Sequence, residues 1–271
     1  MMEALAAGLF GLLIGSFLNV CIYRLPRDLS VVHPRSHCPH CEKLVAWYDN
    51  IPVLSWILLG ARCRHCKSRI HWQYPLVELA TGLLFFWSVY TAGWSALGLK
   101  YCLFSAIMVD LIITDWNDRI LPDEFTLGGF LAGVLIAPFT PAPSGLLSLI
   151  LPSGLSPWIY SIAEAAGGGL LCAGLLFSAG KIYEKVRHRE GLGFGDVKML
   201  LTVGAFLGLP GALMTIFIGS ILGAVLGSIY IWKSGEDLTY ELPYGSFLGA
   251  AALFVGLFGE HLAAWYWKLF L

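Results

Sequence analysis

A glycine-rich stretch that ends in one acidic residue is the first part of this sequence that could do chemistry. It reads Gly191-Leu192-Gly193-Phe194-Gly195-Asp196-Val197-Lys198-Met199-Leu200, and a long apolar segment begins directly after the aspartate. Glycines permit backbone conformations closed to other residues and let another chain approach closely. An aspartate at the mouth of a membrane helix is costly to bury, so it indicates function unless it only caps the helix.

A second acidic segment holds four aspartates within fourteen residues, again beside an apolar run. Asp123 follows Pro122 and suits the N-cap of the next helix, while Asp118 has an arginine beside it. Asp110 lies five residues before Asp115 and therefore points about 140° away from it around a helix. Asp115 is expected at a helix C-terminus, where the macrodipole disfavours negative charge. That local cost favours a functional role for Asp115.

Asp115 and Asp196 could act together as an aspartyl pair. Two carboxyls close together share one proton, so the ionised member activates a water while the protonated member polarises a scissile carbonyl. The sequence contains no catalytic-serine signature such as GxSxG and no HExxH. Aspartyl hydrolysis is therefore the enzyme reaction that these residues favour, and helix capping is the alternative.

Two CxxC pairs predict a structural zinc site. Cys38 and Cys41 form the first pair, and Cys63 and Cys66 form the second after twenty-one intervening residues. Each pair presents two thiolates to one metal, and four such ligands close a tetrahedral site. Two disulfides are a rival in an oxidising compartment, and a thioredoxin-like redox pair lacks its βαβ context. The other three cysteines lie in apolar runs and are expected to be buried small hydrophobic residues: Cys21, Cys102 and Cys172.

The elements that must position these residues are membrane helices. Of the 271 residues, 57% are hydrophobic and only 13% are charged, which is typical of an integral membrane protein. The apolar runs are continuous rather than alternating, which favours helices over a barrel. We expect an all-α polytopic membrane protein with about eight transmembrane helices and a small cytoplasmic zinc-binding domain after the first helix. The runs cover residues 4–23, 76–93, 97–114, 124–139, 161–183, 197–209, 212–232 and 245–267.

The distribution of basic residues predicts the topology. We expect a first transmembrane helix at 1–23, which reads as a retained anchor rather than a cleaved signal. A zinc-knuckle domain at 24–75 and a helical catalytic domain at 76–271 follow. With the N-terminus outside, fifteen of the seventeen Lys and Arg residues fall inside, and only Lys100 and Lys268 fall outside. This asymmetry places both aspartate loops on the cytoplasmic side. The loop within 138–162 then lies outside.

The ordered set of motifs resembles the type IV prepilin peptidases, which are GxGD intramembrane aspartyl proteases also called leader peptidase/N-methyltransferases. The motifs are Gly193-Phe194-Gly195-Asp196, Asp115 followed by Ile120-Leu121-Pro122-Asp123, Gly15-Ser16-Phe17-Leu18-Asn19-Val20 with Arg24-Leu25-Pro26, both CxxC pairs, Asp49-Asn50-Ile51-Pro52-Val53-Leu54-Ser55-Trp56 and Tyr74-Pro75-Leu76-Val77-Glu78. The resemblance implies that Asp115 and Asp196 are the catalytic pair and that Cys38, Cys41, Cys63 and Cys66 bind zinc.

The same resemblance implies an enzyme of the bacterial inner membrane that serves type IV pili or type II secretion. Such enzymes cut the basic leader of prepilins or pseudopilins at a Gly–Phe-type junction on the cytoplasmic side. Many members then methylate the new N-terminal amine with S-adenosylmethionine. The partners expected are therefore these substrates and the lipid bilayer, without nucleic acid.

The methyl-donor site has no recognisable motif. No G-x-G-x-x-G follows a strand, and close helix packing explains Gly167-Gly168-Gly169 within its apolar run. A donor would therefore need a non-Rossmann pocket, which we place as a hypothesis between the zinc domain and the first span near Asn19. Glu190, Asp110 and Glu78 either attract a basic leader or satisfy neighbouring helices.

Two other classes of function stay open. A zinc-stapled scaffold subunit of a pilus or secretion assembly would use its aspartates only as helix caps. A membrane thiol oxidoreductase would use the CxxC pairs, but it requires them on the oxidising side, and the charge asymmetry opposes that placement.

Overall fold

The computed structural model of the chain describes residues 1–140, 150–152, 154–188, 192–234 and 242–268, together with Gly145 and Leu147. Side chains are described up to position 259. Gly191 of the glycine-rich stretch and Glu190 lie outside the described residues, as does most of the expected outer loop between 141 and 149.

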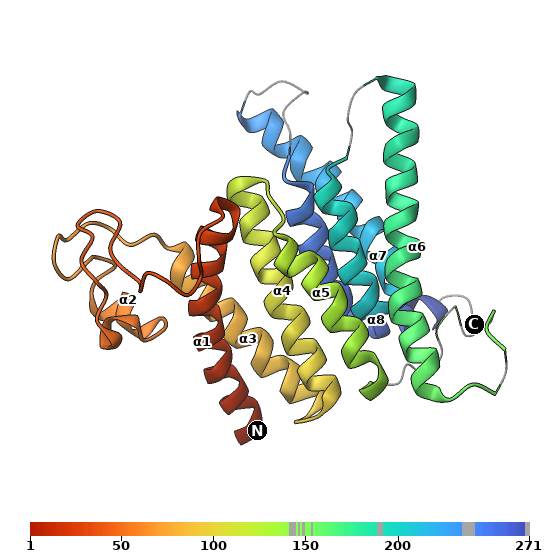
Figure 1. Cartoon of the computed structure of the whole chain (residues 1–271), viewed down its shortest axis with the longest axis horizontal. Helices are drawn as coiled ribbons and strands as arrows, with labels where there is room; N and C mark the ends of the chain where they lie inside the picture. Colours follow the sequence, from red (N-terminus) through yellow and green to blue (C-terminus); the bar gives the residue numbers. More distant parts are fainter. Residues whose placement is uncertain are drawn as a thin grey trace. The chain divides into compact units, whose positions relative to one another are not determined.

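The described residues are mainly helical and contain only isolated β-bridges, so the all-α class is confirmed. Short 3-10 turns connect or extend the helices in the described ranges, among them η1 (Leu25–Arg27), η2 (Trp47–Asn50) and η3 (Ala137–Phe139). The α-helices are α1 (Met2–Arg24), α2 (Leu54–Leu58), α3 (Gln73–Ala92), α4 (Ala96–Asp118), α5 (Asp123–Ile136), α6 (Pro157–Arg187), α7 (Phe194–Ser234) and α8 (Tyr244–Lys268) (Figure 1).

The long helices are those of a multi-pass membrane protein. Within the described residues, five are long and apolar enough to cross a membrane: α1, α3, α4, α6 and α7. The two runs predicted at 197–209 and 212–232 are the halves of α7. The backbone leaves the helix between them at Gly208, with φ 69° and ψ 178°, two residues before Pro210. A positive φ of this size suits glycine, and Pro210 lacks the N–H that a continuous helix would use.

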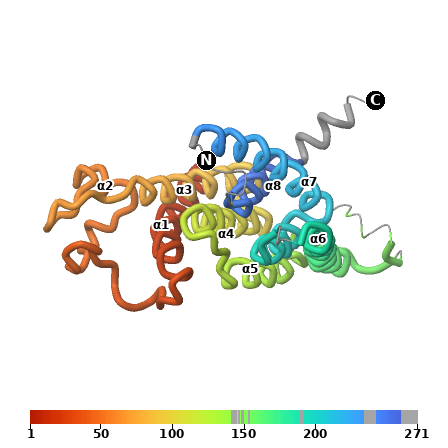
Figure 2. The backbone as a smooth tube through the Cα atoms, turned by 90° about the horizontal axis from the view of Figure 1, so that it is seen from above, coloured from red at the N-terminus to blue at the C-terminus, as the bar shows by residue number. Residues whose placement is uncertain are grey.

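The chain divides into two compact units, residues 1–110 and 111–271. In the first unit α1 lies against α3, as both backbone views show (Figures 1 and 2). A β-carbon placed on Gly15 would lie 2.6 Å from the Cα of Glu78, so only glycine permits this helix spacing. The Asn19 amide donates to the carbonyl oxygens of Gly15 and Tyr74, at 3.3 and 3.0 Å, and so joins the two helices.

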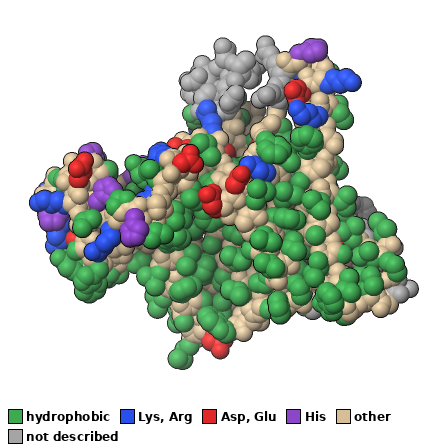
Figure 3. Space-filling model, viewed as in Figure 1, with side chains coloured by type: hydrophobic (Ala, Val, Ile, Leu, Met, Phe, Trp, Pro, Cys, Tyr) green, Lys and Arg blue, Asp and Glu red, His purple; other side chains and the backbone are tan. Residues whose placement is uncertain are grey.

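The polar segment between α1 and α3 is held by two buried charged side chains. Glu78, on α3, accepts a 2.7 Å hydrogen bond from the backbone N–H of Val53. Arg24, the last residue of α1, donates to the carbonyl oxygens of Ser30 and Pro34 at 2.8 and 2.7 Å. The Glu78 carboxylate therefore accepts a hydrogen bond from a neighbouring backbone N–H, and satisfying a neighbouring element is one of the two roles expected for it. Lys, Arg and His side chains gather over this polar segment (Figure 3).

In the second unit, small residues set the distance between α6 and α7. A β-carbon on Gly204 would lie 2.5 Å from both Cα and N of Gly169, and one on Gly168 would lie 2.7 Å from the backbone N of Leu209. The predicted packing role of the triple glycine is confirmed at these two positions. Thr202 donates to the carbonyl oxygen of Thr126 and so fixes α7 against α5.

Candidate functional site

Asp115 lies near the end of α4, with 6% of its surface exposed. The backbone N–H of Ser246, at the start of α8, donates to its Oδ2 at 2.6 Å. The Ser246 hydroxyl is 3.0 Å from the same oxygen and 2.9 Å from the carbonyl oxygen of Ile112. These contacts fix the orientation of the Asp115 carboxyl.

Asp196 lies in the first turn of α7, with 7% of its surface exposed. Its backbone N–H donates to the carbonyl oxygen of Gly193 at 3.2 Å. A β-carbon on Gly193 would lie 3.2 Å from the Asp196 carboxyl, and one on Gly195 would lie 3.1 Å from Leu121. The glycines of the motif therefore leave room for the carboxyl on one side and for Leu121 on the other.

The two carboxyls meet at Gly245. A β-carbon placed on this glycine would lie 3.1 Å from Oδ2 of Asp115 and 3.1 Å from Oδ1 of Asp196. The two oxygens are therefore at most twice that distance apart, although 81 positions separate the residues in the sequence. Two buried carboxyls this close cannot both stay ionised without a large electrostatic cost, so they are suited to share a proton.

Sequence reasoning missed the contribution of α8. Gly245 and Ser246 begin the last apolar run, where nothing in their types or spacing marks a site. The available signal was a pair of small residues directly after Pro243 and Tyr244 at a membrane boundary. Small residues at such a place permit close approach of another group.

The other acidic residues of the second loop have separate positions. Asp110 is fully buried in α4. The predicted N-cap role of Asp123 is wrong, because α5 begins at this residue and Pro122 occupies the N-cap. Asp123 instead forms an ion pair with Lys198 on α7. An acidic side chain in the first turn still interacts favourably with the helix dipole.

The two CxxC pairs fold into matching knuckles. In the first, the Cys38 N–H donates to the carbonyl oxygen of Lys43, and the Glu42 N–H donates back to that of Cys38. In the second, Cys63 and Ser68 form the equivalent bond at 2.9 Å. Glu42 and Lys67, four residues after the first cysteine of each pair, have positive φ angles of 56° and 60°.

The four cysteines are brought together and fit a tetrahedral metal. All their Sγ atoms lie within 4.8 Å of one another, and those of Cys38 and Cys66 are 3.7 Å apart. With Zn–S bonds of about 2.3 Å, the sulfur–sulfur edges of a tetrahedron are about 3.8 Å. Burial opposes ionisation of the Cys38 thiol, but backbone N–H groups of the knuckle and the Ser68 hydroxyl lower its pKa to about 6. A thiolate is therefore favoured at Cys38, whereas at Cys41 the Lys43 backbone N–H is outweighed by desolvation and the neighbouring cysteine sulfurs, which raise the pKa to about 11. The cluster thus favours thiolates at only some of its four positions without a metal.

A charged pair attaches the second knuckle to η2. Arg64 donates to both carboxyl oxygens of Asp49, at 2.7 and 2.6 Å. These hydrogen bonds hold the pKa of Asp49 below its usual value. Planar two-point pairing of this kind adds geometric precision to a small domain.

Asn19 does not mark a ligand pocket. Its amide bonds the backbones of α1 and α3, and it is absent from the lining of the cavity that lies beside α1. The structure therefore gives Asn19 a packing role, although a cavity does lie between the polar segment and α1, where the methyl-donor site was expected, and Ser16, Phe17 and Val20 line it from α1.

Two family models match this chain in succession. The bacterial peptidase A24 N-terminal domain matches residues 9–92, which hold α1, the knuckles and α3. The type IV leader peptidase family matches residues 102–228, which hold both aspartates. The comparison with solved structures gave no match.

Several curated relatives carry the name prepilin leader peptidase/N-methyltransferase. The protein from Myxococcus xanthus is 38% identical over 83% of this chain, and the match spans 62% of that relative. The proteins from Stutzerimonas stutzeri and Xanthomonas campestris are 31% and 34% identical, over 97% and 96% of this chain and 93% of each relative. The last two matches are long enough to span both the knuckles and the aspartate pair. Together with the family models, they show that the chain belongs to the type IV leader peptidase family.

Proposed function

We propose that this chain cleaves the basic leader of type IV prepilins or pseudopilins with Asp115 and Asp196, and then N-methylates the new N-terminus. The observation that carries the peptidase reaction is the meeting of the two carboxyls at Gly245. Their burial supports the same assignment, because an intramembrane acidic residue is expensive and rarely retained without function.

The proposed reaction is a general acid–base hydrolysis. The ionised carboxyl takes a proton from a water, whose oxygen attacks the scissile carbonyl carbon, while the protonated carboxyl donates a hydrogen bond to the carbonyl oxygen. The C–N bond then breaks, and the amine leaves with a proton from the pair. Ser246 donates its backbone N–H to Asp115, and such bonds stabilise an ionised carboxylate. This supports Asp115 as the base and Asp196 as the acid.

The glycine-rich motif supports an extended substrate beside Asp196. Gly193 and Phe194 are exposed, whereas Asp196, three residues after Gly193, is buried. A residue without a side chain at 193 lets a substrate backbone approach the carboxyl. An extended segment is the conformation in which peptide backbones are usually recognised.

The orientation in the membrane follows from charge. We propose a bacterial inner-membrane location with the N-terminus outside and both aspartates at the cytoplasmic face, because the positive-inside distribution favours it. A prepilin carries an apolar helix and a basic leader, so the enzyme must meet it at this interface. In intact cells, Cys38 is then expected to resist a membrane-impermeant thiol reagent.

We also propose zinc at the four cysteines as a structural ion. A closed tetrad leaves no position for substrate, so its work is to fold the polar segment. S-adenosylmethionine would supply the methyl group for the second reaction, in which the new N-terminal amine would be methylated with release of S-adenosylhomocysteine and a proton. The name shared by the relatives supports this second activity.

The test is cleavage of a synthetic prepilin in proteoliposomes by the parent and by Asp115→Asn and Asp196→Asn. Each variant is expected to insert normally, to bind zinc and to lose at least ~100-fold in cleavage rate, the range of a general acid or base. Asp118→Asn, one helical turn after Asp115, is the matched control and should cut at the parent rate.

A second arm separates the two reactions. Pre-cut pilin supplied with S-adenosylmethionine should be methylated by both aspartate variants, because the pair acts only on the peptide bond. If either variant still cuts at the parent rate, the assigned pair is wrong. If the parent neither cuts nor methylates any prepilin, the chain is a scaffold subunit.

A further inference from the structure

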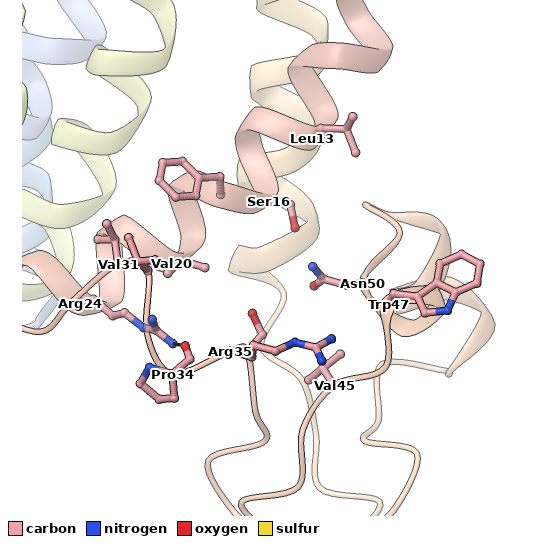
Figure 4. A pocket seen from close by; sticks show the side chains of 13 residues that line it. Leu13, Ser16, Val20, Arg24, Val31, Pro34, Arg35, Val45, Trp47 and Asn50 are labelled. Atoms are coloured by element: carbon pink, nitrogen blue, oxygen red, sulfur yellow. Dashed lines mark hydrogen bonds between the residues drawn. The ribbon is translucent and has the colours of Figure 1, made fainter.

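A cavity of about 410 Å³ lies between the second half of α1 and the polar segment of the first unit (Figure 4). Its walls come from α1 and from two stretches of the polar segment, near Pro34 and near Asn50. This volume is within the range of ligand sites. Neither aspartate of the pair lines this cavity, and the pair belongs to the other unit.

The charge in this cavity is positive. Arg24 and Arg35 line it, and no acidic residue does. Arg24 is 7% exposed, and among the described residues its guanidinium meets only the carbonyl oxygens of Ser30 and Pro34. A buried guanidinium normally pairs with an anion, and five N–H donors leave Arg24 with capacity beyond these two bonds. The Arg35 side chain is exposed and extends across the opening toward Val45 (Figure 4).

The remainder of the cavity is apolar and continues along the membrane helix. Leu13, Phe17 and Val20 line it from α1 at helical spacing, on the same face as Arg24. Phe10 extends this face by one further turn, and Phe10, Leu13 and Phe17 are exposed. One face of α1 therefore leads from a cationic end, where the helix stops, into an apolar stripe along the span.

Trp47 marks the opening of the cavity on the opposite wall. It lines the cavity from η2 and is largely exposed. Exposed tryptophans are enriched at the level of lipid headgroups. The cavity therefore combines a guanidinium pair, an interfacial aromatic residue and a lipid-facing stripe.

We propose that this cavity binds an anionic phospholipid. The phosphate lies between Arg24 and Arg35, and an acyl chain lies along Leu13 and Phe17. Guanidinium groups bind phosphate through two parallel hydrogen bonds. The surrounding segment, residues 24–75, holds eight Lys and Arg against three Asp and Glu residues, which adds attraction to an anionic membrane surface. A bound lipid would fix the polar segment against the end of α1.

The lining disfavours the methyl donor as the occupant. S-adenosylmethionine carries a sulfonium and an ammonium cation against a single carboxylate, so its net charge is positive. The two guanidiniums could bind the carboxylate, but the lining has no acidic residue for either cationic centre. A basic leader peptide is disfavoured for the same reason. The proposal does not depend on the peptidase assignment, because no residue of the aspartate pair contributes to the cavity.

The experiment uses the full chain, delipidated in a neutral detergent, with lipid adducts counted by native mass spectrometry. Phosphatidylglycerol and phosphatidylcholine are compared on the parent, on Arg35→Gln and on Arg69→Gln. Arg69 is an exposed arginine of the same segment that does not line this cavity, so its variant makes the same change of charge elsewhere. Thermal stability with each lipid, with inorganic phosphate and with S-adenosylmethionine is the second readout.

The parent is expected to retain phosphatidylglycerol in preference to phosphatidylcholine and to gain stability only from the anionic lipid. Arg35→Gln should lose at least two thirds of the adduct, while Arg69→Gln keeps it. Equal losses in the two variants would show diffuse attraction and overturn the site. If the parent retained the two lipids equally, the ligand would not be an anionic phospholipid. The same conclusion would follow if inorganic phosphate or S-adenosylmethionine gave the full stabilisation instead.

Discussion

Ser246 donates its backbone N–H to Oδ2 of Asp115 across 2.6 Å, and this bond joins residues 131 positions apart. The beginning of α8 thereby orients the carboxyl at the end of α4. Gly245, the preceding residue, keeps free the space that the Asp115 and Asp196 carboxyls share. Hydrogen bonds to an ionised group are short and strong, so α8 belongs to the proposed active site as much as α4 and α7 do.

The first prediction concerns Gly245→Ala. The added methyl would lie 3.1 Å from an oxygen of each carboxyl, a contact tight enough to displace them. Because a small misplacement of catalytic groups is costly, cleavage should fall by about 10- to 100-fold. The measurement is prepilin cleavage in proteoliposomes together with the thermal midpoint, which should stay near that of the parent.

Gly128→Ala, in α5, is the control for this prediction. A β-carbon there meets no atom within 4 Å, and alanine is a better helix former than glycine. This variant should cut at the parent rate. An active Gly245→Ala protein would show that the two carboxyls do not need the geometry seen here.

The sequence predicted the helices well because lipid leaves the chain few choices. A continuous apolar run must satisfy its own backbone, so the runs in α1 and α6 could be read directly as helices. The Cys38 and Cys63 knuckles were also local, since each pair and its turn lie within six residues. Such features need no information about distant parts of the chain.

The composition of the proposed active site could be read only in part. Asp115 and Asp196 are anomalous by themselves, because each is an acidic residue at a membrane boundary. Gly245 is not anomalous, and its role depends on where α8 places it relative to two other helices. The hydrogen bond from Ser246 to Asp115, which joins residues 131 positions apart, was hidden for the same reason. Contacts of this kind come from the tertiary packing and leave no local pattern.

The second prediction concerns Ser246→Ala. The substitution removes the hydroxyl at 3.0 Å from Asp115 but keeps the backbone donor. One hydrogen bond is worth ~1 kcal/mol, so the turnover rate should fall about fivefold. The Michaelis constant should change little, because the Ser246 hydroxyl is engaged by the Asp115 carboxyl and the carbonyl oxygen of Ile112. The measurement is a full rate profile against prepilin concentration.

Ser178→Ala is the matched control, since the Ser178 hydroxyl bonds the carbonyl oxygen of Gly174 within its own helix, α6. It should leave turnover unchanged. A Ser246→Ala protein that raises the Michaelis constant and keeps its turnover rate would instead place the hydroxyl in substrate binding.

The third prediction concerns the packing of α6 against α7. Gly204→Ala would place a methyl 2.5 Å from the backbone of Gly169, so the helices must move apart. Overpacking of this kind should lower the free energy of unfolding by ~1–3 kcal/mol. The measurement is thermal unfolding in detergent, followed by tryptophan fluorescence. Gly174→Ala on α6, where a β-carbon meets nothing within 4 Å, should match or exceed the parent, and equal destabilisation of both variants would contradict the argument.

The last prediction concerns the metal. The purified chain should carry about one zinc ion, because four thiolates at tetrahedral spacing close a single site. Cys41→Ser should lose the ion, whereas Cys172→Ser should keep it, since Cys172 is buried in α6 and is not one of the four clustered cysteines. Without zinc the polar segment has little apolar core to keep it folded, so a chelator should expose residues 25–72 to protease while the long helices stay intact. The measurements are metal analysis and limited proteolysis with mass mapping. The parent could instead purify without zinc, and its polar segment could resist protease equally before and after chelation. That result would mean that the Asp49–Arg64 pair and the backbone bonds of the knuckles are sufficient to fold the polar segment.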